Sequence, residues 1–412
     1  MEKYRDIIGR INYGLFLAVV FLLPFPQTVL RYLCTAWIIM WVFEFRWLSK
    51  PQLVFRRTAL PFIAGGLWFV WQLISGLWAA DHAAWSWQIE RYLTFILLVP
   101  VGLWGVNSHY DWRQAGKALV MGCIAALPFY LILMTALYIR PDWIHLLSPD
   151  AWDFMHPTWW TYFSGNISAI KHRLFLCTIE LFGAYMAFLL YRKRPKILIP
   201  AWIVMLSFIP LTDSRQAIFL ALVLSVIMVL YALPEHLRSK FSWTVVVIGL
   251  LIGGAVLKLH PRMEQVNLHT LSEMKQITYD HEARLNIWTL ALEHPSDYLP
   301  WGLGAGQSRK YLINRYNEVG LDSYADMRFH AHNQYLEEMM ETGFVGLVLL
   351  LIMLIAGPVC ARGQGQESAV ILTTLFGLNM FIDCMFGLFC GIALWAVGLV
   401  LIALQSLPSH AA

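Results

Sequence analysis

The chain alternates long apolar runs with short polar breaks along its whole length. Each run is close to the roughly 20 residues that a helix needs to cross a hydrocarbon core of about 30 Å. Inside such a core, only helices and closed barrels satisfy every backbone hydrogen bond. The pattern therefore predicts an all-α polytopic integral membrane protein with about 12 transmembrane helices. The runs begin near Ile11, Leu30, Ala59, Tyr92, Lys117, Leu174, Ile197, Ala217, Trp243, Gly343, Ala369 and Phe389.

Composition supports this class. Hydrophobic residues make up 58% of the 412 residues and charged residues 14%, whereas a soluble domain carries roughly 25% charged residues. A soluble enzyme is therefore excluded. The cysteines all lie in apolar segments without the spacing of a disulfide framework or a zinc site, so we expect small buried hydrophobes. They are Cys34, Cys123, Cys177, Cys360, Cys384 and Cys390.

Basic residues cluster in the loops on one side of the predicted bundle. Short cytoplasmic loops carry an excess of Lys and Arg, and this rule fits every hairpin when the N-terminus is cytoplasmic. Both termini are then cytoplasmic. The loops concerned carry Arg46, Lys50, Arg56 and Arg57; Arg113 and Lys117; Arg192, Lys193, Arg194 and Lys196; Arg238 and Lys240; and Arg362.

This threading places two long segments on the opposite, outer side. Residues 140–172 form a Trp-rich loop, as expected of a segment at the membrane interface. Residues 258–342 form the larger loop, between the ninth and tenth spans, and we expect short helices in it because structureless loops of this length are uncommon. No repeat or soluble domain interrupts the chain, so residues 1–412 are interpreted as a single membrane domain.

A very short outer hairpin, "LTDSRQA", places Arg215 at the outer membrane surface. Taken alone, this position is typical of an arginine whose guanidinium reaches the lipid headgroups. The other outer hairpins mostly lack such a residue, and "TDSR" gathers several polar groups within one turn. A functional role for Arg215 is the alternative.

The larger loop predicts an amphipathic surface helix followed by a glycine-rich turn. Arg284, Ile287, Trp288 and Leu292 recur at three- and four-residue spacing, and the helix is expected to end near Pro295. The turn that follows contains glycines whose amides could approach a phosphate closely. It resembles a nucleotide fingerprint only superficially, because no βαβ unit surrounds it. Its glycines are Gly302, Gly304 and Gly306.

The stretch "RFHAHNQYLEEMMETGFVGL" gathers most of the chain's candidate chemistry. His332 and Asn333 are expected at the start of a helix, and a histidine with a pKa near 6.5 can accept a proton at neutral pH. One face of this helix is expected to meet apolar surroundings and the other polar ones; Gly343 ends its polar part. The apolar face holds Leu336, Met340 and Phe344, and the polar face holds Glu337, Glu338 and Glu341.

Two questions remain open at this point. The glutamates either orient the ring of His332 or lie on a solvated face. The spacing of His330 and His332 also permits a metal site, with Asp322 or Asp326 as a carboxylate partner, although no second ligand cluster has convincing spacing. We therefore expect no metal.

Taken in order, these motifs resemble those of the O-antigen ligase superfamily. They are the "TDSR" hairpin, an R-x-x-x-W helix followed by "PWGLGAG", and the "HAHNQYL" stretch with its E-x-G-x-x-G-L continuation. The superfamily includes lipopolysaccharide O-antigen ligases, O-antigen polymerases and bacterial protein O-oligosaccharyltransferases. The motifs cover residues 211–347, and the expected number of spans extends the resemblance over the whole chain.

The resemblance implies a multi-pass protein of the bacterial inner membrane whose site faces the periplasm. The donor it implies is an O-antigen glycan on undecaprenyl diphosphate, and the acceptor is a hydroxyl of lipid A-core. Membrane lipids are further partners, and neither a cofactor nor nucleic acid is expected. Arg215, Arg284 and His332 align with the functional arginines and histidine of the family.

Those residue types suit this chemistry. The planar guanidinium of arginine binds two phosphate oxygens at once, so Arg215 and Arg284 are interpreted as catalytic ligands of the diphosphate. A diphosphate leaves without a general acid, whereas the acceptor hydroxyl needs a base, the role assigned to His332. A single base opposite the leaving group favours direct displacement, which inverts the anomeric carbon, and no metal is expected to take part. Further substrate contacts are expected from His330, whose own role is left open, and from Asn333, Gly304 and Glu337.

Within the superfamily, the chain length and the single long outer loop favour O-antigen ligase, with O-antigen polymerase as the alternative. A transporter of polyprenyl-linked glycans is an alternative from another class, because transporters place charges at mid-membrane. Here Glu180 is the main deeply placed acid, and Asp383 is expected near the outer end of its span. Most other ionisable groups lie outside, which favours chemistry at the membrane surface.

Overall fold

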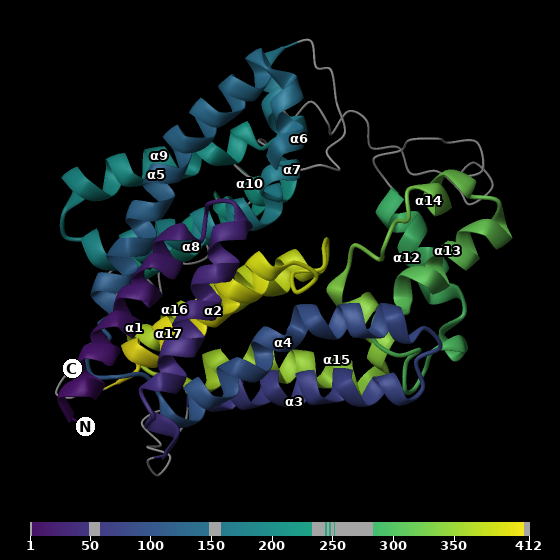
Figure 1. Ribbon diagram of the computed structural model, residues 1–412. Coiled ribbons are helices and arrows are strands. Elements are labelled where there is room, and N and C mark those ends of the chain that lie inside the picture. The colour runs from purple at the N-terminus through teal and green to yellow at the C-terminus, as the bar shows by residue number, and fades with distance from the viewer. Residues whose placement is uncertain are drawn as a thin grey trace. The chain divides into compact units, whose positions relative to one another are not determined.

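A computed structural model describes residues 2–48, 58–147, 158–232, 244, 247, 248, 251 and 283–407 (Figure 1). The regular elements in these ranges are all helices, as the apolar pattern predicts. Within the described ranges, four helical segments are long and apolar enough to cross a membrane: Leu60–Leu77, Trp112–Ile139, Arg173–Tyr191 and Gln334–Cys360. Shorter apolar helices cover Gln27–Phe43, Pro195–Leu211, Arg215–Leu230 and Phe389–Gln405.

The predicted starts of the apolar runs agree with these helices. Every predicted start within the described residues falls inside a helix or, for Ala59, one residue before it. The start of the run predicted from Trp243 lies outside the described residues, as does most of the run. The multi-pass membrane class is thus supported, while about 12 spans stays a prediction.

The chain divides into two compact units, and each is described by itself; a single membrane domain therefore stays a prediction. The first unit comprises residues 1–46 and 107–260. Its α8 is buried along nearly its whole length and packs against α5, α9 and α10. The helices of this unit are α1 (Glu2–Leu22), α2 (Gln27–Phe43), α5 (Trp112–Ile139), η4 (Pro141–Trp143), α6 (Ile144–Leu147), α7 (Trp159–Ile170), α8 (Arg173–Tyr191), α9 (Pro195–Leu211) and α10 (Arg215–Ala232).

Two sequence features fall in this first unit. The Trp-rich loop predicted over residues 140–172 forms the short helices η4, α6 and α7, apart from residues 148–157, which lie outside the described ranges. The "TDSR" hairpin joins α9 to α10: Asp213 takes a left-handed φ of 50°, and Arg215 is the first residue of α10. This hairpin is held to α8 because the Cys177 Sγ and Thr212 Oγ1 lie 3.2 Å apart.

The second unit comprises residues 47–106 and 261–411. In it, α15 packs along α3 and α16, while α3 packs against α4 (Figure 1). The part of the predicted outer loop that the structure describes, residues 283–342, forms short helices as expected. The helices are α3 (Leu60–Ile74), η3 (Ser75–Leu77), α4 (His82–Trp104), α12 (Ala283–Glu293), η7 (Pro295–Asp297), α13 (Ser308–Val319), α14 (Asp322–Asp326), α15 (Gln334–Cys360), α16 (Gln364–Met380) and α17 (Phe389–Gln405), with η1 (Arg46–Leu48) at the boundary.

The short helices α12, α13 and α14 share a small core of their own. Ile287, Leu290 and Ala291 form the buried stripe of α12, and Leu312 and Tyr316 of α13 pack against it. The prediction of a helix ending near Pro295 is confirmed. Leu292 is exposed, whereas α13 packs against the buried stripe of α12. An amphipathic position at the membrane surface stays a prediction.

A kink at Gly343 divides α15 into a polar first part and a long apolar second part. Gly343 takes φ 66° and ψ −157°, a conformation that side-chain-bearing residues rarely adopt. The kink releases backbone groups of α15 from the helical ladder, and the turn at residues 299–306 pairs with them. Leu303 N donates to Met340 O at 2.9 Å, Gly304 N to Glu341 O at 2.7 Å, and Phe344 N to Pro300 O at 3.0 Å.

The glycines allow this close approach. A Cβ at Gly343 would lie 2.0 Å from the Pro300 carbonyl oxygen, and one at Gly302 would lie 2.3 Å from the Glu341 carbonyl oxygen. Both distances are far below van der Waals contact, so neither position tolerates a side chain without a backbone shift. The glycine-rich turn is therefore packed directly against the backbone of α15 around its kink.

Candidate functional site

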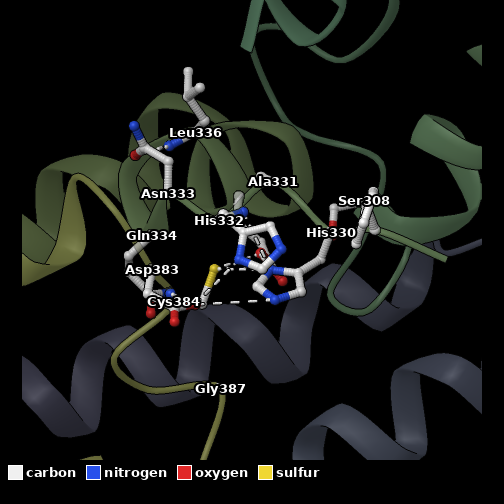
Figure 2. A network of polar contacts seen from close by, with 12 residues as sticks. Ser308, His330, Ala331, His332, Asn333, Gln334, Leu336, Asp383, Cys384 and Gly387 are labelled. Atoms are coloured by element: carbon white, nitrogen blue, oxygen red, sulfur yellow. Dashed lines mark hydrogen bonds and ion pairs between the residues drawn. The ribbon is translucent and has the colours of Figure 1, made fainter. Parts of the chain in front are cut away.

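The two histidines of the "HAHN" motif lie in a short loop that enters α15 (Figure 2). The residue between them is fixed to α12, because the Trp288 Nε1 donates to the Ala331 carbonyl oxygen at 2.9 Å. His332 takes a left-handed φ of 46°, which is uncommon for a residue with a side chain. The two rings lie with their centroids 3.9 Å apart. The loop thus presents both imidazoles together.

Asn333 forms the N-cap of α15. Its Oδ1 accepts hydrogen bonds from the backbone N–H groups of Tyr335 at 3.0 Å and Leu336 at 3.1 Å. Its backbone is extended, as N-cap residues require. The predicted helix start at His332–Asn333 is confirmed, and Asn333 fixes the loop on the helix. A contact of Asn333 with substrate stays a prediction.

A carboxylate from a distant part of the sequence faces the histidines. Asp383 lies in the loop between α16 and α17, where its Oδ1 is 3.6 Å from the His332 Nδ1 and 3.9 Å from the His330 Nε2 (Figure 2). The His332 Nδ1 is buried and makes no hydrogen bond within the described residues. The Asp383 carboxylate is thus the acid placed to orient this ring.

Cys384, the neighbour of that aspartate, belongs to a second group around His330. The Cys384 Sγ lies 2.6 Å from the Glu337 Oε2 and 3.5 Å from the His330 Nδ1. The Glu337 Oε2 lies 3.4 Å from the same Nδ1. Glu337 therefore meets His330 rather than His332, which answers in part the open question about the glutamates.

The other two glutamates do not lie on a solvated face, so that alternative is wrong. Glu338 is 2% exposed and Glu341 is 3% exposed. The Glu338 Oε1 accepts a hydrogen bond from the Gln72 Nε2 at 2.7 Å, and the Glu341 Oε1 accepts one from the Ser308 Oγ at 2.6 Å. Buried carboxyls need such partners. Both side chains tie α15 to neighbouring helices, while Phe344, expected on the apolar face, is half exposed.

The surroundings shift the pKa values of the two histidines in opposite directions. Burial lowers the pKa of His332; Asp383 raises it, but His330 and Arg284 lower it further, and the net pKa lies below its ordinary value of 6.5. Burial also lowers the pKa of His330, but Glu337 and Asp383 outweigh it, so the net pKa of His330 is raised. His332 is therefore neutral at pH 7 and able to accept a proton.

Arginines border the histidine loop. Arg284, on α12, lies close enough for its charge to lower the pKa of His332. Arg309, on the first turn of α13, acts in the same way on His330. Sequence reasoning predicted Arg284 but missed Arg309, although "QSRKY" offers it three residues after the glycine-rich turn. The charges of two arginines thus reach the histidine loop, which also faces two carboxylates, and the arginines suit an anionic substrate.

For Gly304 and Arg215, the structure does not test the predicted role at the site. The amide of Gly304 is engaged by Glu341, and a Cβ on Gly304 would lie 2.6 Å from the Ala79 Cβ. This favours a bracing role, and its contact with substrate stays a prediction. Arg215 belongs to the other compact unit, so its participation in one site with His332 also stays a prediction.

The donor atoms that could hold a metal form two groups within the described residues: His330 with His332 and Asp383, and His330 with Glu337 and Cys384. Neither includes Asp322 or Asp326, the carboxylates considered from the sequence; both acids lie on α14. Sequence reasoning missed that Asp383 and Cys384 lie beside the histidine loop. The signal was present in "NMFIDCMFGLF", where a polar pair interrupts two apolar runs.

Comparison with known proteins bears on the same stretch of chain. No curated protein matches the sequence. One family model, described as O-antigen ligase (Wzy_C), matches residues 200–351, which include Arg215, Arg284 and His332. Asp383 and Cys384 lie beyond the matched stretch. The chain therefore carries an O-antigen ligase family domain over residues 200–351.

Proposed function

We propose that this protein is an O-antigen ligase, which transfers O-antigen glycan from undecaprenyl diphosphate to lipid A-core at the periplasmic face of the inner membrane. The observation that carries the proposal is the neutral, partly buried His332, which has a carboxylate beside its Nδ1 and an arginine nearby. The family domain supports glycan transfer as the reaction class. The residues then suggest the roles that follow.

His332 acts as the general base. With its Nδ1 turned toward Asp383, its Nε2 is the nitrogen available for the acceptor hydroxyl. The hydroxyl oxygen attacks the anomeric carbon of the donor, its proton passes to the Nε2, and the bond from that carbon to the diphosphate breaks. Attack opposite the leaving group inverts the anomeric centre. The reaction needs no metal, because the diphosphate departs as a stable anion.

Arg284 stabilises the charge that develops on the departing diphosphate. A guanidinium offers two parallel N–H groups to phosphate oxygens, and such contacts strengthen as negative charge accumulates. Arg215 is proposed as the second ligand of the diphosphate. Asp383 is a positioning residue: it fixes the ring of His332 and stabilises the imidazolium that forms after proton transfer.

The choice of ligase over polymerase rests on the chain's organisation. The sequence predicts a long outer loop, residues 258–342, before the last three spans. A polymerase would use the same donor and the same base, and would differ only in which hydroxyl it receives. The acceptor therefore decides between the two functions.

A gene deletion separates them. We expect a deletion strain to make lipopolysaccharide core without O-chains, while long glycans accumulate on the lipid carrier. The readouts are the lipopolysaccharide gel profile and the pool of polyprenyl-linked glycan. Core that carries single repeat units would indicate a polymerase, and an unchanged profile would refute both.

A transfer assay with purified protein tests the base. We expect His332→Asn to lower the rate of transfer by about 10²–10⁴-fold, the usual contribution of a general base. His294→Asn is a matched control, because His294 is an exposed histidine of the same outer loop. Parental rates for a correctly folded His332→Asn protein would exclude the proposed mechanism.

A further inference from the structure

Three side chains with different donor atoms converge beside the proposed base. The His330 Nδ1, the Glu337 Oε2 and the Cys384 Sγ lie within 3.5 Å of one another. They come from separate parts of the second unit: the histidine loop, the first turn of α15 and the loop before α17. Neither the fold of these segments nor the proposed transfer reaction requires a thiol at this point.

Their spacing resembles that of ligands around a tetrahedral ion. With bonds of about 2.3 Å to sulfur and about 2.0–2.1 Å to nitrogen or oxygen, the ligand atoms of a zinc site lie about 3.3–3.6 Å apart. The nitrogen–sulfur distance of 3.5 Å and the nitrogen–oxygen distance of 3.4 Å already match. Only the sulfur–oxygen distance of 2.6 Å must lengthen.

The cluster is also accessible and suited to a thiophilic ion. Cys384 is buried, but the side chains of His330 and Glu337 are 23% and 16% exposed. An ion can therefore reach the cluster, and a fourth coordination position stays open to water. A thiolate combined with an imidazole and a carboxylate favours Zn²⁺ or similar borderline-soft ions over Mg²⁺ or Ca²⁺.

We propose that His330, Glu337 and Cys384 form a binding site for a thiophilic divalent cation such as Zn²⁺, and that its occupation inhibits the enzyme. Binding forms bonds from the metal to the His330 Nδ1, a Glu337 oxygen and the Cys384 sulfur. The thiol proton is released to solvent, as thiolate ligation requires. No bond of the substrate changes in this step.

The inhibition follows from a hydrogen bond to the same nitrogen. The His330 Nδ1 accepts a hydrogen bond from the backbone N–H of His332 at 3.2 Å. An imidazole nitrogen has one lone pair, so an ion that binds the Nδ1 removes this acceptor. The backbone at His332, which takes an uncommon left-handed conformation, then loses a partner that holds it. This part of the inference rests on the proposed function of His332.

The second donor group is a weaker candidate for the ion. In it, the His330 Nε2 lies 3.9 Å from the Asp383 Oδ1, longer than the spacing of a tetrahedral site, and the His332 Nδ1 lies 3.6 Å from it, at the upper end of that spacing. It also lacks a thiol. The two groups predict different spectra, so a single experiment distinguishes them.

Cobalt is the probe. The full-length protein, purified in detergent micelles without reducing agent, is titrated with Co²⁺ while its absorption is recorded. We expect one ion to bind per chain, with a thiolate-to-cobalt charge-transfer band in the near ultraviolet that Zn²⁺ removes. Cys384→Ser should abolish the band, whereas Cys390→Ser, at a buried cysteine of the same unit, should retain it. Glu337→Gln should weaken binding.

Other outcomes overturn the assignment. A charge-transfer band that survives in Cys384→Ser would place the ion on another cysteine. Cobalt binding without a thiolate band, lost in Asp383→Asn, would place it on the other donor group. Absence of binding at concentrations that saturate a free His–Cys peptide would refute the site.

The transfer assay tests the inhibitory part separately. Zn²⁺ should slow glycan transfer by the parental protein severalfold, and a chelator should restore the rate. Cys384→Ser should transfer glycan without the ion and resist Zn²⁺, since a serine hydroxyl can still donate a hydrogen bond to Glu337. Binding of Zn²⁺ without inhibition of transfer would show that the ion does not act through His332. A protein that binds cobalt but never transfers glycan would contradict the proposed function and leave the ion site standing.

Discussion

The side chain of His332 meets opposing influences on its charge. Burial, His330 and Arg284 favour the neutral imidazole, whereas Asp383 favours the imidazolium. A base needs the neutral form before proton transfer and stabilisation of the charged form after it. Burial, His330 and Arg284 favour the neutral imidazole before proton transfer, and Asp383 stabilises the imidazolium after it.

The pH dependence of transfer should reflect this balance. Because the pKa of His332 is lowered, the rate should rise with pH through a midpoint below 6.5 and then stay level. The check is kcat/KM for glycan transfer between pH 4.5 and 8, with a stability control at each pH. A midpoint above 6.5 would contradict the assignment of His332 as the base.

Asp383→Asn should change that profile in a way that a structural role would not. Removal of the carboxylate takes away an influence that raises the pKa of His332, so the midpoint should move to lower pH. The maximal rate should also fall, since the ring loses its orienting partner. Measurement of the full profile for both proteins separates the two effects, and an unmoved midpoint would count against positioning by Asp383.

Arg284 is proposed to stabilise the leaving diphosphate, so its loss should appear in the chemical step. We expect Arg284→Ala to lower kcat by about 10²–10³-fold, a range typical for loss of a group that stabilises developing negative charge. Lys310→Ala provides a control, because Lys310 is an exposed cation of the same unit. A change in KM alone would indicate that Arg284 contributes only to ground-state binding.

At the scale of elements, Asn333 connects the loop to the helix. Asn333→Ala removes the cap of α15 and should lower the free energy of unfolding by about 0.5–2 kcal/mol. Asn333→Asp retains an acceptor at the same position and should lose less. Thermal unfolding in micelles compares the two variants, and equal losses would show that the cap is not the cause.

The helices were predictable because a bilayer leaves the backbone few alternatives. The start of α15 at Asn333 and the end of α12 before Pro295 also followed from local signals. The surroundings of the glutamates did not follow from the sequence, because helical periodicity indicates which face of a helix a residue lies on but not which side chain packs against that face. Gln72, the partner of Glu338, is more than 260 residues away in sequence. Asp383 was missed for the same reason, since only the packing of α16 against α15 brings it to His332.

At the scale of the whole molecule, the orientation in the membrane is open to a direct test. Met327 is an exposed residue close to the histidine loop, and Arg362 is predicted on the cytoplasmic side. A membrane-impermeant thiol reagent should label Met327→Cys in intact spheroplasts and Arg362→Cys only after permeabilisation. The native protein provides the background, and the reverse pattern would invert the topology.

The late position of Asp383 and Cys384 in the sequence also determines when, during translation, the site can form. During translation, α3 and α4 leave the ribosome long before the histidine loop, and Asp383 follows only after α16. A nascent chain therefore holds Arg284 and His332 before it has Asp383. On the proposed mechanism, the site becomes competent for transfer only once the segment that follows α16 has been made and inserted.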